Sequence, residues 1–233
     1  SVISGVNKFV QIQFNLSDLQ LGFSVSSLTI VAALAMMFSG PLSDKYGRKL
    51  VLKYCALIFT VSAIGSALAT GFTSFLIFRM LGGLGVGASL IVAPMYIAEI
   101  APASKRGRLV SFNQLNIVLG ITIAFFTNYY ILSLADHTSS WVSNYGIAEH
   151  NWRWMLGIEA LPAIVYFFAL FSVPKSPRWL MSKGNENKAT AVLQRFISVE
   201  ETAEEIKAIK AALNNINSSR KTPITELFKP AMR

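Results

Sequence analysis

The sequence predicts an all-α membrane protein, and three observations carry that prediction. Apolar residues make up 53% of the 233 residues and charged residues only 14%, whereas soluble domains carry about 25% charged residues. The apolar residues gather into stretches long enough to cross a bilayer as helices. The positive charges fall almost entirely on one side of the threading that these stretches define, as membrane insertion requires.

Five segments of mostly apolar residues have the length of about 20 residues that a spanning helix needs. They are Leu19–Pro41, Leu50–Ala69, Phe75–Ile100, Leu109–Leu132 and Trp154–Val173. Residues 1–10 are typical of the last turns of an earlier span. We therefore expect residues 1–174 to form a transmembrane bundle of one truncated helix and five whole spans.

The distribution of Lys and Arg fixes the orientation of these spans. Eighteen of the 21 positive charges lie in the connections 42–53 and 101–108 and in the tail from Lys175 onward, whereas the connections 70–74 and 133–151 contain none. The charged connections must therefore be cytoplasmic. The net charge of +9 thus reflects topology, so we expect a multi-pass protein of a cell membrane, plasma or bacterial inner, with the lipid bilayer and not nucleic acid as its surroundings.

The chain changes character after Pro174. Residues 175–221 alternate polar and apolar positions at helical spacing, and the run from Ser198 to Glu201 has the form of a capping box that starts a helix. We expect a cytoplasmic helical linker domain over 175–221, followed at 222–233 by the approach to a seventh span that is missing from this sequence. No catalytic nucleophile motif and no metal-ligand constellation occurs in the sequence, so neither an enzyme, a cofactor nor a metal is predicted.

Three short motifs stand at the cytoplasmic ends of the spans. They are Gly40-Pro-Leu-Ser-Asp-Lys-Tyr-Gly-Arg-Lys49, Pro94-Met-Tyr-Ile-Ala-Glu-Ile-Ala-Pro102 with Arg106-Gly107, and Pro174-Lys-Ser-Pro-Arg-Trp-Leu180. Together they resemble the motifs of the sugar porters of the major facilitator superfamily, with Lys45 in place of the usual Arg and Lys175 in place of the usual Glu. The resemblance implies the N-terminal six-helix half of a twelve-helix transporter plus short cytoplasmic helices, with a second six-helix half as its partner.

Two charged residues fall inside predicted spans. Arg79 lies about 9 Å and Glu159 about 12 Å below the outer surface, counted at the helical rise, so the two lie level and can pair. Intramembrane charges are costly and are functional candidates, here for proton coupling, with a purely structural ion pair as the alternative. The resemblance implies a coupling acid two residues before Ser1, next to this pair.

The resemblance also implies a sugar site and an inner gate. Gln114 is the polar candidate of the sugar site, because an amide offers donors and an acceptor to hydroxyl groups, and Ile117 and Ile121 occupy further pocket positions. The inner gate would consist of Asp44, Arg48, Glu99, Arg106 and Arg178. The run Gly82–Gly87 lies in mid-membrane with no strand before it, which favours close helix packing over a phosphate loop.

These residues predict transport of a monosaccharide by alternating access, as a sugar/proton symporter. Ile117 and Ile121 resemble the glucose facilitators instead, so a uniport facilitator stays open as an alternative, and a sugar sensor that does not transport is a third. The sequence alone does not identify the sugar.

Overall fold

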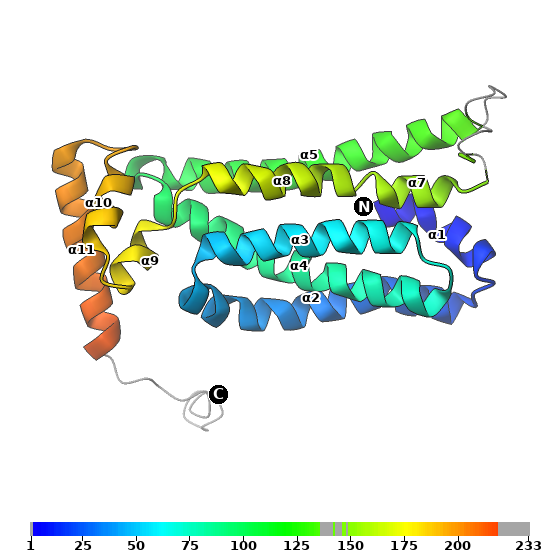
Figure 1. The fold of residues 1–233 in the computed structure, drawn as a ribbon, viewed down its shortest axis with the longest axis horizontal. Coiled ribbons are helices and arrows are strands. Elements are labelled where there is room, and N and C mark those ends of the chain that lie inside the picture. Colours follow the sequence, from blue (N-terminus) through cyan, green and yellow to red (C-terminus); the bar gives the residue numbers. More distant parts are fainter. Residues whose placement is uncertain (1, 136–141, 143–145, 148, 219–233) are drawn as a thin grey trace. The chain divides into compact units, whose positions relative to one another are not determined.

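The computed structural model describes residues 2–135, 142, 146–147 and 149–218. The chain divides into two compact units, Ser1–Ser176 and Pro177–Arg233, and each is considered by itself. The predicted approach to a seventh span at 222–233 lies outside the described residues. Figure 1 shows the helical ribbon and its labels.

The first unit is a bundle of long helices. Its elements are α1 (Val2–Gln13), α2 (Asp18–Tyr46), α3 (Arg48–Ala67), α4 (Phe72–Ile100), the 3₁₀ turn η1 (Ala103–Lys105), α5 (Arg106–Ala135), α7 (Asn151–Gly157) and α8 (Ala160–Ser172). Within the described residues, five segments are long and apolar enough to cross a membrane: 18–46, 48–67, 72–100, 106–135 and 151–172. The five predicted spans are therefore confirmed, with ends that move by a few residues.

Local signals set the ends of α2. Ser17 accepts the backbone N–H of Gln20 at 3.3 Å, and the Gln20 side chain accepts the backbone N–H of Ser17 at 3.0 Å, which is a complete capping box. At its other end α2 passes into α3 through Gly47 alone, whose φ of 93° favours glycine. The glycine of the first motif thus makes the tight cytoplasmic turn between two spans.

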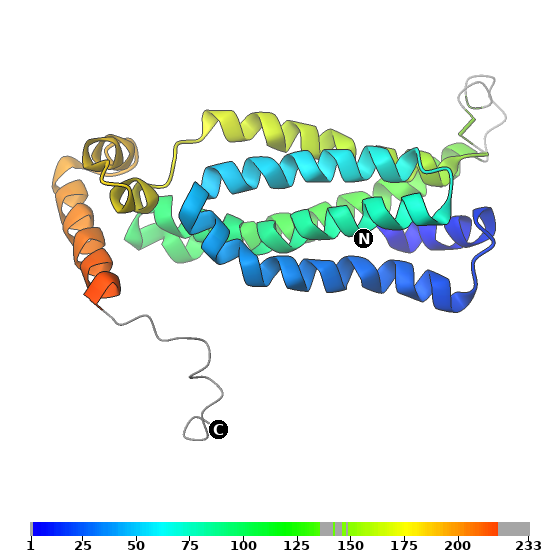
Figure 2. The ribbon, with the colours of Figure 1, turned by 60° about the horizontal axis from the view of Figure 1, so that its bottom comes forward.

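The glycine run packs α4 against both of its neighbours. A Cβ on Gly83 would lie 2.6 Å from the Leu28 carbonyl oxygen, and a Cβ on Gly87 would lie 2.0 Å from the Ala32 carbonyl oxygen, both on α2. On the other face, a Cβ on Gly82 would meet the Ser62 hydroxyl of α3 at 2.5 Å. Figures 1 and 2 show α2, α3 and α4 side by side, so the prediction of close helix packing is confirmed.

The last span is interrupted, which the sequence analysis did not predict. α7 ends at Gly157 and α8 begins at Ala160. In the connection, the backbone N–H groups bond to the carbonyl three residues earlier and not four, from Glu159 to Leu156 and from Leu161 to Ile158. Pro162 has no N–H to donate to the carbonyl four residues earlier, at Ile158. The span predicted over 154–173 is confirmed as the segment 151–172, but its helix is interrupted, and the break places Glu159 at a helix junction.

Apolar cores occupy both ends of the bundle. One core joins α1, the outer end of α3, the start of α4, the end of α5 and α7, and includes Phe75, Trp152 and Met155. The other joins the cytoplasmic halves of α3, α4 and α8, and includes Leu52, Val92 and Leu170. We name these the outer core and the inner core.

The second unit is a small helical domain made of α9 (Pro177–Ser182), α10 (Glu186–Leu193) and α11 (Val199–Ser218). Its own core includes Leu180, Leu193 and Ile206. The predicted capping box is confirmed, because the Ser198 N–H donates to the Glu201 carboxylate at 3.1 Å and the Glu201 N–H donates to the Ser198 hydroxyl at 3.2 Å.

Candidate functional site

A cavity of about 660 Å³ lies inside the first unit, between the outer and the inner core. Its lining residues come from α2, α3, α4, α5, the junction before α8 and α8 itself. They are Val25, Leu28, Thr29, Phe59, Ser62, Ala63, Arg79, Gly82, Val86, Ile121, Glu159, Pro162, Ala163 and Tyr166. Because these positions fall near the middle of their spans, the cavity lies at mid-membrane depth.

Both predicted intramembrane charges line this cavity. Arg79 enters it from α4 and Glu159 from the junction of α7 and α8, and each is close enough to feel the charge of the other. Among the described residues, however, no nitrogen of Arg79 lies within 4.0 Å of a Glu159 oxygen, and Arg79 Nε is buried without a hydrogen bond. The direct ion pair considered in the sequence analysis is therefore not formed, and the two charges face a shared chamber instead.

The three predicted sugar-site residues separate in the structure. Ile121 lines the cavity, whereas Gln114 and Ile117 are not among the lining residues. Gln114 lies two turns toward the cytoplasm on the same face of α5 as Ile121, and it is exposed in this chain, whereas Ile117 is half-buried. The assignment of Gln114 and Ile117 to a sugar site therefore stays a prediction.

A cluster of charged groups closes the cytoplasmic end of α2, α3 and α4. Arg48, only 7% exposed, bonds the Asp44 carboxylate at 2.7 Å and the Glu99 carboxylate at 2.9 Å through Nη2. Its Nη1 donates to the Ser43 carbonyl at 3.1 Å, and the Ser176 hydroxyl donates to the other Glu99 oxygen. The structure thus brings together Asp44, Arg48 and Glu99 of the predicted gate.

The other two predicted gate residues are placed differently. Arg106 is the first residue of α5 and is half-buried. Arg178 belongs to the second unit, in α9. Their part in a gate stays a prediction, as does the effect of Lys175, which is exposed.

Two residues that the sequence analysis did not single out fasten the end of α8. The Lys49 ammonium donates to the carbonyl oxygens of Phe171 at 3.1 Å and Val173 at 2.6 Å, where a cation is favourable because the last carbonyls of a helix lack partners. The Tyr96 hydroxyl donates to the Pro174 carbonyl at 2.7 Å. Both residues belong to the motifs described above, so their positions were marked in the sequence. Their bonding partners could not be predicted, because these lie 78 to 124 residues away in the chain.

The fold and this arrangement define a class of protein. Membrane-spanning helices line a charged cavity, and a cluster of ionic bonds joins the cytoplasmic ends of α2, α3 and α4. This is the construction expected of one half of a secondary transporter, which binds its solute near the membrane midplane.

Comparison with known proteins identifies the family. The sequence matches the family described as "Sugar (and other) transporter" over residues 4–232. It is 40% identical over 210 residues to the glucose transport protein of Synechocystis, covering 89% of this chain and 44% of that protein. It is 37% identical over 213 residues to the D-xylose-proton symporter of Escherichia coli K12, covering 84% of this chain and 42% of that protein.

Solved structures agree with the sequence relatives. The proton:xylose symporter XylE of the major facilitator superfamily, bound to 6-bromo-6-deoxy-D-glucose, superposes with a TM-score of 0.82 at 34% identity, covering 92% of this chain and 49% of that one. The chain therefore belongs to the sugar transporter family of the major facilitator superfamily and is a multi-pass membrane protein. It spans about half the length of the curated relatives it matches.

Proposed function

We propose that this chain is the first six-helix half of a monosaccharide/proton symporter that works by alternating access. The observation that carries the proposal is the mid-membrane cavity in which Arg79 and Glu159 face each other without direct contact. Two charges held apart in a low-dielectric chamber can respond to a proton or a solute that arrives between them, whereas a closed pair responds weakly.

Relatives support the proton-coupled form of this proposal. Matching proteins include the arabinose-proton symporter of Bacillus subtilis, 36% identical over all of this chain and 48% of that protein, and the xylose symporters described above. In this mechanism the half-buried Glu159 carboxylate would take up a proton together with the first-helix acid that the family resemblance implies. Protonation would remove the negative charge that faces Arg79, so the electrostatic energy of the Arg79 guanidinium would change as the sugar binds. Changes of this kind shift the equilibrium between outward and inward states.

The cluster around Arg48 would serve as the inner gate. Its bonds connect α2, α3, α4 and the segment that leaves α8, so they favour the state in which the cytoplasmic end is closed. Opening toward the cytoplasm would exchange these bonds for water, at a modest net cost since each partner is then hydrated.

The experiment is a transport assay on the full-length protein that contains this chain, reconstituted in proteoliposomes without a pH gradient. Uptake of labelled glucose, xylose or arabinose should make the external medium more alkaline. Arg79→Gln should abolish both sugar uptake and the alkalinisation that accompanies it while some sugar binding remains, and Gln114→Ala should weaken sugar binding. Lys8→Gln, an exposed charge outside the cavity, is the matched control and should transport normally.

A uniport facilitator is the second candidate, favoured by the apolar Ile121 at the cavity wall and by the glucose transport protein among the relatives. Sugar that equilibrates without any change in external pH would support the facilitator and contradict symport. Sugar binding without uptake would contradict both and favour a sensor. Normal sugar uptake with normal alkalinisation in Arg79→Gln would remove the coupling role proposed for the cavity.

A further inference from the structure

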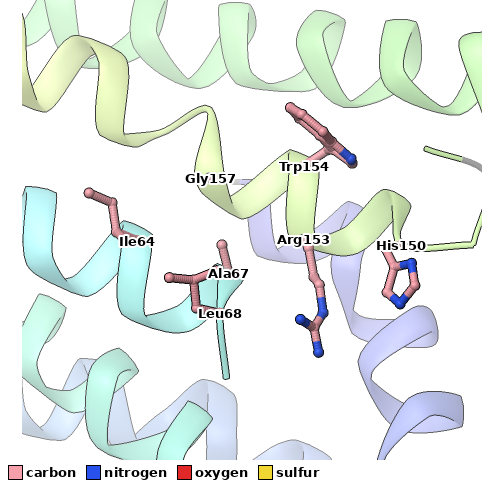
Figure 3. A pocket seen from close by; sticks show the side chains of 7 residues that line it. All are labelled: Ile64, Ala67, Leu68, His150, Arg153, Trp154 and Gly157. Carbon is pink, nitrogen blue, oxygen red and sulfur yellow. The ribbon is translucent and has the colours of Figure 1, made fainter. Parts of the chain in front are cut away.

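A second pocket lies at the outer end of the first unit, away from the cavity. It has a volume of about 490 Å³ and lies between the end of α3 and the start of α7. Its walls are Ile64, Ala67, Leu68, His150, Arg153, Trp154 and Gly157. The α3 wall is apolar, and the polar groups stand on α7 (Figure 3). The transport proposal makes no use of any of these residues.

Arg153 departs from the charge pattern of the rest of the chain. Eighteen of 21 positive charges lie on the cytoplasmic side, whereas Arg153 stands two residues after the start of α7, at the outer face. A helix that enters a bilayer meets the lipid phosphates within its first turns. Arg153 is therefore at the depth of the headgroups of the non-cytoplasmic leaflet.

The guanidinium of Arg153 is only partly occupied by the protein. Nη2 donates to the Ala69 carbonyl at 3.2 Å, and the group lies 5.0 Å from the Trp152 ring. Nε is buried and has no hydrogen bond, and Arg153 forms no ion pair with any carboxylate of the described part of the chain. The neighbouring acid Glu149 is exposed and does not line the pocket. An anion with several oxygens could use the remaining donors, as phosphates do with arginine.

Figure 3 places His150 beside Arg153 on the same side of α7, with both side chains directed away from Trp154. The histidine ring is exposed and adds a second nitrogen donor near the guanidinium. The apolar residues of α3 lie next to this pair in the figure, and Leu68 is 66% exposed. The pocket therefore has a cationic side next to an open apolar side. These two sides are complementary to the phosphate and to the upper acyl chain of a phospholipid.

An apolar stripe runs from the pocket along the last span toward the cytoplasm. Exposed residues recur there at alternating spacings of four and three, from α7 through the break to α8. They are Trp154, Ile158, Leu161, Val165 and Phe168. α7 faces α3 through two small residues, Gly157 and Ala67, which leave space between the helices. Even a Cβ on Gly157 would lie 3.6 Å from the Ala67 Cβ, an ordinary contact distance. The last span therefore presents exposed apolar residues over most of its length below the pocket.

We propose that this pocket binds an anionic phospholipid of the non-cytoplasmic leaflet, with Arg153 as the main phosphate ligand, His150 as a second donor and the α3 end as the seat of the upper acyl chain. The site is independent of the sugar site. Its occupant would bridge the end of α3 and α7, next to the bond by which Arg153 holds the carbonyl of Ala69, two residues after α3.

The test counts bound lipids by native mass spectrometry on the full chain in detergent, titrated with dioleoyl phosphatidylglycerol. The unchanged chain should retain one phosphatidylglycerol that survives removal of loosely bound lipid. Arg153→Gln should weaken that binding on the order of tenfold, the effect of losing one charge-assisted contact. Lys8→Gln removes an equal charge from an exposed site outside the pocket and should bind as the unchanged chain does.

Further arms separate the sources of the phosphate and protect the test against misfolding. Dioleoyl phosphatidylcholine should bind more weakly, and free glycerol phosphate should not displace the lipid. Leu68→Trp, at an exposed position, should block the pocket without changing charge and should also lose the lipid. Equal retention by Arg153→Gln or Leu68→Trp, equal binding of phosphatidylcholine, or displacement by free glycerol phosphate would overturn the proposal.

Discussion

The two ends of the helix bundle are held together by different physics. At the outer end, Trp152 packs edge-on against Phe14 and Phe75, with ring centroids 5.7 and 6.4 Å apart, inside a core of buried apolar side chains. At the cytoplasmic end, the apolar inner core is smaller, and the polar cluster of Asp44, Arg48 and Glu99 lies at its margin.

This difference bears on which end can open. Apolar packing gains nothing from water, so separating the outer core costs the whole burial term. Charged and hydroxyl groups exchange one partner for another at a small net cost. The proposed function therefore assigns opening to the cytoplasmic junction, whereas the outer junction among the bundle's own helices is expected to stay closed.

The largest effect is expected at the outer junction. Trp152→Ala removes a side chain that is only 2% exposed and should destabilise the bundle by about 3–5 kcal/mol, because truncating a buried aromatic leaves a cavity. The measurement is the midpoint of thermal unfolding in detergent, followed by circular dichroism. Tyr129→Ala, at a position 73% exposed, is the control and should shift the midpoint far less. Equal shifts for the two variants would contradict the outer core as the junction that stays closed.

A smaller loss of stability and a larger change in function are expected for Arg48→Ala. Water can replace the guanidinium at Asp44, which is 69% exposed. The loss is therefore set by the Glu99 carboxylate, 8% exposed, and should be about 1.5–3 kcal/mol, the contribution of a hydrogen bond to a charged group. In the full-length protein the inward-open state should gain population, which cytoplasmic labelling of cysteines introduced along α4 would report. Lys45→Ala removes an exposed charge from the same turn and should leave labelling unchanged. If labelling did not rise in Arg48→Ala, the cluster would be a stabilising feature and not a gate.

Much of this comparison could be predicted from the sequence. The lengths of the apolar segments were sufficient to place five spans, because bilayer thickness fixes the length of a spanning helix. The orientation that the positions of Lys and Arg indicate stays a prediction. The Gly82–Gly87 run indicated close packing, and the family resemblance indicated Arg48 and Glu99 as members of one gate. These signals lie in short segments of the sequence, so they can be recognised without a structure.

Other features depend on contacts that no local pattern reveals. The separation of Arg79 from Glu159 goes with a cavity that is lined jointly by five helices and the junction before α8. The similar depth of Arg79 and Glu159 could be predicted from the helical rise. The lateral distance between them could not, because it depends on how the helices pack. The bonds of Lys49 to the end of α8 join residues 122 and 124 positions apart. The break before Glu159 did have a local signal in Pro162, which the apolar run concealed.

The smallest effect is expected where a single neutral bond fastens the cytoplasmic end. Tyr96→Phe removes the hydroxyl that donates to the Pro174 carbonyl at 2.7 Å and keeps the ring that packs on the inner core. It should lower the unfolding free energy by about 1 kcal/mol, the net worth of one such hydrogen bond, with a correspondingly small shift of the thermal midpoint. Tyr54→Phe, 59% exposed, should shift it less.

The transport readout of this variant gives the sharper test. Because the lost bond holds the end of α8 and not the cavity, the proposed symport should keep its sugar affinity while the rate of the conformational step changes. A variant with weaker sugar binding and an unchanged rate would show that Tyr96 acts on the cavity. That result would contradict the proposal that the bonds at the cytoplasmic end control the conformational step while the cavity controls sugar binding.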